Sequence, residues 1–277
     1  MYLLFDIGGT RMRLASSFDG QKINDTQYFL TPQDFEKGMK IIREFVLKAD
    51  SSRMDIIGCC GLPGVFNKEK DMLINAQNLP FWVAKPIKKE LEGIIHNTVY
   101  LENDADLAGL GEAVKGAGKG NEIVAYITVG TGVGGVRIVN GKIDKSTYGF
   151  EPGHQIIDAD ATIAGKLTDL EGLVAGVGIE TRFDKKPEDI NDDQVWRDAE
   201  KYLAIGLTNT ILHWSPNIVV LGGGLIINER YSVQRIRSYI SEYLKVFTIL
   251  PDIKKGELGE EAGLQGAIVY LQGLTPR

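Results

Sequence analysis

Short apolar runs alternate along this chain with longer stretches in which apolar residues recur every three or four positions. The runs Tyr2–Ile7, Ile123–Val129, 55–60 and 218–221 predict strands, the first of them buried on both faces. Strands and helices interspersed in this way predict an α/β fold. Three-to-four spacing places the helices at 31–48, 105–114, 193–214, 231–247 and 261–271.

One arrangement occurs in both halves of the chain. A buried strand, a glycine turn and an alternating strand follow one another at 2–17 and again at 123–139. The repetition predicts two similar lobes. The glycine-rich link 116–120 is the best candidate for a hinge, so the predicted domains are 1–115 and 116–277. The C-terminal helix, at about 261–273, is a candidate to pack back on the first domain.

Three glycine turns follow apolar strands, at Gly8 to Thr10, Gly130 to Gly132 and Gly222 to Gly224. Such turns let backbone N–H groups approach a phosphate closely, because no Cβ blocks the contact. None of the three continues as a Walker motif or as the six-residue dinucleotide fingerprint. Strands follow two of them, so hairpins rather than a helix dipole would hold the phosphate.

An apolar strand at 99–101 runs into three carboxylates and an amide, of which Asn103 and Asp104 lie at its carboxyl end. Acidic groups at a strand end in an α/β sheet usually face the ligand crevice, where an aspartate can take a proton from a bound hydroxyl. The alternative is a solvated turn in which Asp104 caps the helix that follows. These residues by themselves favour the cap.

Charge and composition indicate which classes of partner are disfavoured and in which compartment the protein is expected. The 277 residues are 43% hydrophobic and carry a net charge of -6, and no basic cluster is interleaved with aromatic residues, which disfavours nucleic acid and anionic membrane. No apolar run reaches the length of a membrane span, and the amino terminus lacks a basic segment, so we expect a cytoplasmic protein. Cys59 and Cys60 are adjacent in an apolar run, which indicates buried strand residues without a disulfide or metal.

The motifs taken together resemble the actin-like sugar kinases, and within them the ROK family of bacterial-type glucokinases and their relatives. The resemblance rests on the three glycine turns and extends from Asp6 to about residue 267. Further motifs in the family's order are Gly61-x-Pro63-Gly64, Asn78-Leu79-Pro80, Glu102-Asn103-Asp104-Ala105, Glu151-x-Gly153-His154 and Leu170-Glu171.

The resemblance implies two actin-like (ribonuclease H-like) lobes with mixed sheets flanked by helices and an active site in the cleft between them. It implies ATP-dependent phosphorylation of a hexose hydroxyl, with the 6-hydroxyl of glucose favoured over fructose, allose, mannose, N-acetylglucosamine and N-acetylmannosamine. A non-catalytic sugar sensor is the alternative, because the family includes repressors. Those carry a winged helix-turn-helix ahead of the kinase-like body, whereas the first strand here begins at Tyr2. The family also often forms homodimers.

The resemblance implies a role for each matching residue. Asp104 is the expected general base, and Asp6 is expected to place Mg²⁺, through water. The adenosine is expected against Gly222, Gly223 and Gly224. The expected sugar ligands are Gly64, Asn78, Asn103, Asp104, Glu151, His154 and Glu171. The expected phosphate holders are Gly8, Gly9, Thr10, Arg11 (where the family commonly has lysine), Gly130, Thr131 and Gly132.

The sequence departs from the family at its metal site. Most members bind a structural zinc through the histidine of Glu-x-Gly-His and three cysteines shortly after it. No cysteine lies between His154 and Glu171, so a sulfur-rich tetrahedral site cannot form in this window. We therefore predict no structural zinc. Asp158 or Asp160 is the hypothetical replacement that holds the His154 ring.

Overall fold

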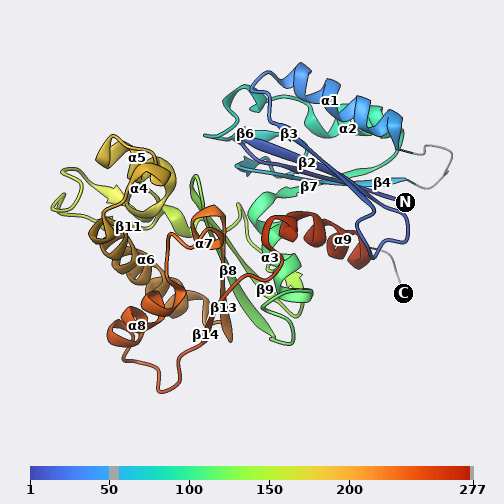
Figure 1. Ribbon diagram of the computed structural model, residues 1–277. Helices are drawn as coiled ribbons and strands as arrows, with labels where there is room; N and C mark the ends of the chain where they lie inside the picture. The colour runs from blue at the N-terminus through green and yellow to red at the C-terminus, as the bar shows by residue number, and fades with distance from the viewer. Residues whose placement is uncertain (50–55, 275–277) are drawn as a thin grey trace. The chain divides into compact units, whose positions relative to one another are not determined.

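The computed structural model describes residues 1–49 and 56–274, and its chain divides into two compact units (Figure 1). The first unit comprises Met1–Gly111, Lys145–Gly149 and Glu261–Arg277, and the second comprises Glu112–Asp144 and Phe150–Glu260. Within the described residues, no helix is both long enough and apolar enough to cross a membrane.

The first unit is built on a five-stranded mixed sheet of order β3-β2-β1-β4-β7. Strands β1, β4 and β7 are parallel, whereas β2 and β3 continue from β1 as an antiparallel meander. Because parallel strands end at the same edge of a sheet, the residues that follow β1, β4 and β7 are brought together there. The strands are β1 (Tyr2–Ile7), β2 (Arg11–Ser17), β3 (Asp25–Leu30), β4 (Ile57–Leu62) and β7 (Val99–Asn103).

Helices cover both faces of this sheet, which explains why β1 is apolar at every position except Asp6. Leu3, Phe5 and Ile7 share a core with helices α1 (Phe35–Lys48) and α2 (Ile87–Ile95). Leu4 points to the opposite face and packs with α3 (Asp104–Val114) and α9 (Ala262–Leu274). Figure 1 shows α9 on the side of the sheet away from α1 and α2. The small strands β5 (Val65–Phe66) and β6 (Leu73–Asn75) and the 3₁₀ helix η1 (Pro80–Trp82) fill the connection from β4 to α2.

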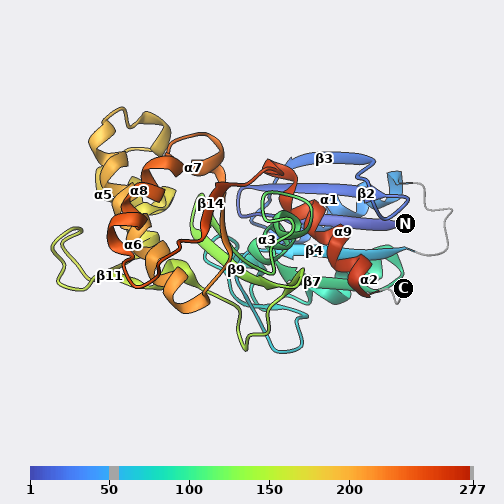
Figure 2. The same cartoon turned by 90° about the horizontal axis from the view of Figure 1, so that it is seen from below.

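The second unit contains a five-stranded sheet of order β10-β9-β8-β13-β14. Strands β8 and β9 form an antiparallel hairpin, and β13 and β14 run parallel to β8. Helices α4, α6 and α8 share the main core with β8 and β13, and Figure 2 shows the unit from below. The strands are β8 (Ile123–Val129), β9 (Val133–Val139), β10 (Lys142–Ile143), β13 (Ile218–Gly222) and β14 (Asp252–Lys255).

The remaining elements of the second unit carry or support the predicted sugar residues. The pair β11 (Ile156–Asp158) and β12 (Thr168–Asp169) forms a separate two-stranded sheet. The helices are α4 (Leu170–Val174), α5 (Gly176–Phe183), α6 (Asp193–Trp214), α7 (Gly224–Ile227) and α8 (Val233–Tyr243), and the 3₁₀ helices are η2 (Pro152–His154), η3 (Pro187–Asp189) and η4 (Gly259–Glu261).

Several predicted boundaries move in the structure. Helix α1 begins at Phe35 rather than near residue 31, because Asp34 caps it by accepting the N–H of Lys37. Strand β9 begins directly after Gly132, and helix α8 ends at Tyr243 rather than near 247. Of the predicted strand 55–60, Asp55 lies outside the described residues, and β4 extends to Leu62. Both cysteines of β4 are fully buried and free, as predicted.

Glu112, near the end of α3, explains the glycine-rich link that follows it. Its buried carboxylate accepts the N–H groups of Ala117, Glu257 and Leu258 at 2.8–3.1 Å. A Cβ on Gly116 would collide with that carboxylate. Glycine at 116 therefore permits a close backbone approach that ties two distant segments of the second unit to one side chain.

We predict that truncating Leu264 of α9 destabilises the first unit, because this fully buried side chain packs against β1 and β4. The Leu264→Ala change should lower the free energy of unfolding by about 2–5 kcal/mol. Leu274, on the same helix, is 47% exposed, and Leu274→Ala should change it by less than about 0.5 kcal/mol.

The measurement is urea unfolding followed by the fluorescence of Trp82, which is buried in the first unit. Trp196 and Trp214 belong to the second unit and are replaced by phenylalanine, so that the signal reports one unit. Equal midpoints for the two leucine variants would show that α9 does not stabilise this sheet.

Candidate functional site

Asp104 stands at the first position of α3, directly after β7. The cap of this helix is Asn103, whose side-chain oxygen accepts the N–H groups of Ala105 at 2.8 Å and Asp106 at 3.3 Å. The interpretation of Asp104 as the cap is therefore wrong, because its neighbour takes that role. Asp104 itself lies in the first turn, where the helix dipole interacts favourably with an acidic side chain.

The other two acids of this stretch are held inside the first unit. Glu102 is 3% exposed and forms an ion pair with Lys70, so it is a buried strand residue as its position on β7 predicts. Asp106 is 8% exposed in the first turn of α3. Asp104 is the member of the three that remains only partly buried.

Asn103 also joins two of the loops at this edge of the sheet. Its side-chain nitrogen donates to the carbonyl of Gly64 at 3.1 Å. Gly64 has a φ of +117°, and a Cβ there would overlap the carbonyl of Asn75, so this position requires glycine. The two predicted sugar residues are thus in contact, and the Asn103 amide also stabilises the Gly64 loop and the start of α3.

The first glycine turn packs against a predicted sugar residue. A Cβ on Gly9 would lie 2.6 Å from the Cβ of Asn78, so only glycine allows the turn to approach so closely. Gln33 bridges the two by donating to the carbonyls of Gly9 and Asn78, each at 3.3 Å. Thr31 donates to the carbonyl of Gly8 at 2.7 Å. Gln33 carried no sequence signal, because its role depends on the meeting of loops 45 residues apart.

Asp6 lies across the β1–β2 ladder from Arg13, and their side chains form an ion pair at 3.1 Å. Both side chains are mostly buried, with 13% and 19% of their surfaces exposed. Sequence reasoning identified Asp6 but gave Arg13 no role. The hairpin register could have found it, because a two-strand ladder with this turn places residue 13 opposite residue 6.

The two glycine turns of the second unit lie side by side. Strands β8 and β13 are parallel and adjacent, and a Cβ on Gly130 would lie 3.6 Å from the backbone nitrogen of Gly224. Gly223 has a φ of +86°, and a Cβ there would overlap Val129 and the Thr128 side chain. The turn predicted to hold phosphate and the turn predicted to contact adenosine are therefore adjacent.

Three predicted sugar residues, Glu151, His154 and Glu171, gather near the start of β9. A carboxylate oxygen of Glu171 accepts the N–H of Val133 at 2.8 Å, and a Cβ on Gly132 would come within 2.5 Å of that oxygen. The turn predicted to hold phosphate thus touches an acid predicted to hold sugar.

The His154 ring is held by Asp169, with 2.9 Å between Nδ1 and Oδ2. The hypothesis that Asp158 or Asp160 holds this ring is wrong. The buried Asp158 carboxylate instead accepts the N–H groups of residues 162, 163 and 164, each at 2.8 Å, and Asp160 is exposed. Asp169 escaped notice because an aspartate just before Leu170-Glu171 looks like an ordinary helix cap.

The charges of this cluster shift two pKa values. Loss of water around its carboxylate raises the pKa of Glu151; the nearby His154 lowers it and Glu171 raises it. The hydrogen bond to Asp169 raises the pKa of His154, against an opposing effect of burial, and Glu171, Asp169 and Glu151 raise it further by charge. An imidazolium donates from both ring nitrogens, so one can serve Asp169 and the other a ligand.

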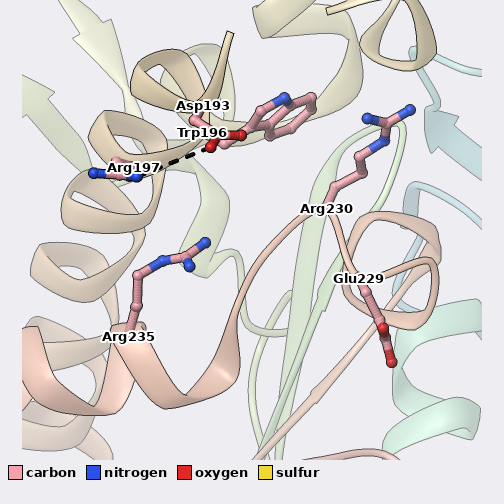
Figure 3. Close-up of a pocket in the computed structure, with 6 residues that line it drawn as sticks. All are labelled: Asp193, Trp196, Arg197, Glu229, Arg230 and Arg235. Carbon is pink, nitrogen blue, oxygen red and sulfur yellow. Dashed lines mark ion pairs between the residues drawn. The ribbon is translucent and has the colours of Figure 1, made fainter. Parts of the chain in front are cut away.

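A separate pocket of the second unit is lined by none of the predicted residues (Figure 3). Arg230 lies over the Trp196 ring at 5.6 Å, and Asp193 pairs with Arg197 at 3.9 Å. Arg235 forms a two-pronged ion pair with the buried Glu200. Carboxylates partner Arg197 and Arg235, and Arg230 donates to the backbone carbonyl of Glu188, so this pocket shows no preference for an anion. Its lining residues are Asp193, Trp196, Arg197, Glu229, Arg230 and Arg235.

Comparison with known proteins decides the family. The model of the ROK family matches residues 2–273. The chain belongs to the ROK family. The N-acetyl-D-glucosamine kinase of Vibrio atlanticus is 29% identical over 299 residues, which cover 96% of this chain and 98% of that protein.

Solved structures of ROK proteins bear out the predicted α/β fold class. The ROK hexokinase of Thermus thermophilus matches with a TM-score of 0.80 and 26% identity, covering 98% of both chains. A ROK family transcriptional regulator, a homolog of the E. coli MLC protein, matches with a TM-score of 0.81 over 99% of this chain and 78% of its own. At 18% identity the regulator shows the shared fold alone.

We predict that His154 titrates above the ordinary histidine pKa of about 6.5 because Asp169 stabilises its charged form. A pKa raised by folding makes the ion pair contribute to stability most fully below the unfolded pKa, and that contribution disappears as pH rises through the folded value. The check is a proton NMR titration, in which the three histidines of the chain are separated by a His154→Gln spectrum. A His154 midpoint at or below 6.5 would contradict the ion pair.

Proposed function

We propose that this ROK protein transfers the γ-phosphoryl group of ATP to a hydroxyl of a hexose. The observation that supports the proposal is the contact between Glu171 and the 132–133 backbone, because it joins an acid predicted to bind sugar to a turn predicted to bind phosphate. The named kinases among the relatives support it, as does the hexokinase among the solved structures.

Asp104 is the general base in this proposal. It would take the hydroxyl proton while the sugar oxygen forms its bond to the γ-phosphorus. The bond from that phosphorus to the β–γ bridging oxygen breaks, and ADP leaves. In such reactions positioning and charge stabilisation contribute most of the acceleration. The position of Asp104 at the first residue of α3, directly after β7, supports this assignment, because strand ends at this edge of the sheet are where ligands of such folds bind.

The remaining predicted residues would bind the two substrates. The backbones of the turns 8–10 and 130–132 would hold phosphates, with the exposed Arg11 reaching them, and the turn 222–224 would lie against the adenosine. The side chains or backbones of Gly64, Asn78, Asn103, Glu151, His154 and Glu171 would contact the sugar. The side-by-side turns of the second unit support a single bound nucleotide.

Mg²⁺ fits the first glycine turn, because it is typically bound by one or two carboxylates together with phosphate oxygens. Asp6, one residue before the end of β1, is the carboxylate that would hold it, through water. Bound there, Mg²⁺ would neutralise the charge that develops on the phosphates. Arg13 would balance the charge of Asp6 when the ion is absent.

The preferred hexose is the finer part of the proposal. Glucose is favoured because Glu151, His154 and Glu171 offer two acceptors and a donor for ring hydroxyls. N-acetylglucosamine is the second candidate, because the Vibrio relative carries that name. The test is kcat/KM with ATP for glucose, mannose, fructose, allose, N-acetylglucosamine and N-acetylmannosamine. Highest efficiency with N-acetylglucosamine would replace glucose, and binding without turnover of any sugar would indicate a sensor.

The cytoplasm remains our proposed compartment and a homodimer our proposed assembly, with no nucleic acid partner. Cys59 and Cys60 are free and agree with a reducing compartment. Burial raises the pKa of each thiol and so makes it unreactive.

We predict that Asp104→Asn lowers kcat for hexose phosphorylation by at least about a hundredfold, because an amide cannot accept the proton. Sugar affinity in calorimetry should change little, since the amide keeps the shape of the carboxylate. The matched control is Asp106→Asn, two residues later on α3, which should keep kcat within about threefold. Equal losses in the two variants would remove Asp104 from the chemical step.

A further inference from the structure

Asp169 uses its two carboxylate oxygens for two different elements. Oδ2 contacts Nδ1 of His154 at 2.9 Å, and Oδ1 accepts the N–H of Gly172 at 2.8 Å as the cap of α4. His154 ends η2, and α4 carries Glu171 in its first turn. One side chain thus connects two of the residues proposed to bind the hexose.

The backbone around this connection is anchored independently of Asp169. Gln155 accepts the N–H of Leu170 at its carbonyl and donates from its side chain to the carbonyls of Pro152 and Gly206. Asn209 of α6 donates to the Gln155 side chain at 2.9 Å. These bonds hold η2 and the start of α4 against α6. Asp169 therefore contributes two things: it orients the imidazole, and it caps the N-terminus of α4.

Exposure argues against a role in stability. The His154 side chain is 45% exposed and that of Asp169 is 27% exposed. Ion pairs in contact with water contribute little to folding. A partly exposed, well-aligned pair beside two carboxylates instead fixes which ring nitrogen faces a ligand, because the hydrogen bond at one nitrogen determines the role of the other.

The donor set around His154 does not fit the zinc that most of the family carries. A structural zinc needs four ligands, usually with sulfur among them, and no cysteine lies between His154 and Glu171. Cys59 and Cys60 are buried in the first unit, and the part of the chain that the structure describes has no group of three or more histidine, cysteine or acidic side chains suited to a metal. Nδ1 of His154 is already bonded to Asp169.

We propose that Asp169 is a positioning residue of the sugar site and performs, without metal, the task that zinc performs in most ROK proteins. When the imidazole is protonated, Nδ1–H of His154 donates to Asp169 and Nε2–H faces away from that bond, where it can donate to a hexose hydroxyl. The same carboxylate caps α4 and keeps Glu171 against residue 133. The proposal rests on the proposed function only in that the ligand is a hexose.

The decisive variants separate the two bonds of Asp169. Asp169→Ser keeps a good helix cap but is too short to hold the ring, and Asp169→Asn keeps the cap and a neutral hydrogen bond. Asp160→Asn, in the same segment and exposed, is the matched control. All are compared with wild type by circular dichroism, thermal unfolding, sugar calorimetry and steady-state kinetics.

Asp169→Ser should weaken sugar affinity and raise KM for the hexose roughly tenfold, with kcat and Tm nearly unchanged, because a hydrogen bond to a charged group is lost. The sugar affinity and KM of Asp169→Asn should lie between those of Asp169→Ser and wild type. His154→Gln should cause a loss similar to Asp169→Ser, and the double variant should be no worse than either single one. Additive losses, or an unchanged KM in Asp169→Ser, would overturn the proposal.

The pH dependence of sugar affinity distinguishes the proposed role of Asp169 from a purely structural one, because a purely structural residue would not change it. The groups that face His154 are Glu151, Asp169 and Glu171. Wild-type sugar affinity should fall as pH rises through the His154 pKa, and in Asp169→Asn the same fall should occur at lower pH. His154 NMR titration of both proteins gives the same comparison without sugar or turnover. An unchanged His154 midpoint in Asp169→Asn would refute the proposal even if no hexose bound.

Metal analysis tests the replacement of zinc directly. Purified wild type should hold no stoichiometric zinc, and chelator or added zinc should leave sugar affinity unchanged. One zinc per chain, with sugar affinity lost on chelation, would overturn the proposed role of Asp169 and leave the proposed kinase activity intact. Loss of sugar affinity in Asp169→Ser, with no turnover of any hexose by wild type, would support the role of Asp169 and overturn the kinase activity.

Discussion

The convergence of parallel strand ends is the constraint on which the site depends. In the first unit β1, β4 and β7 deliver the first glycine turn, the Gly64 loop and Asp104 to one edge of the sheet. In the second unit β8 and β13 deliver both remaining glycine turns to one edge. Residues up to 98 positions apart in the sequence, Asp6 and Asp104, are therefore ordered by strand pairing alone. Packing of helices on the apolar faces of these strands fixes the strands, and so fixes the positions of the residues at their ends.

Close backbone approach is the second requirement, and it explains why glycine rather than any small residue occupies the turns. At Gly9 and Gly132 a single Cβ would collide with a neighbouring predicted sugar residue, Asn78 or Glu171. In each case a turn predicted to bind phosphate meets a residue predicted to bind sugar. The absence of a Cβ at these glycines permits that contact and would also let the backbone N–H groups approach a phosphate.

The sequence was most informative where a local pattern determines the structure. Buried strands and glycine turns followed from apolar runs, and Asp104 followed from a motif. Its capping role was assigned wrongly, because Asn and Asp are equally good caps and only the backbone decides between neighbours. The pairing of Arg13 with Asp6 could have been predicted from the register of the hairpin. The roles of Gln33 and Asp169 could not, since their partners are set by loop packing that no spacing encodes.

A charge in place of a metal changes how a binding site responds to its surroundings. Zinc would hold a neutral imidazole whose other nitrogen stays a donor over a wide pH range. A carboxylate holds the ring most firmly when the imidazole is protonated, so the alignment of His154 is linked to its own proton. If Asp169 takes the place of zinc as we propose, the predicted sugar site needs no metal and its affinity depends on pH, whichever hexose it accepts.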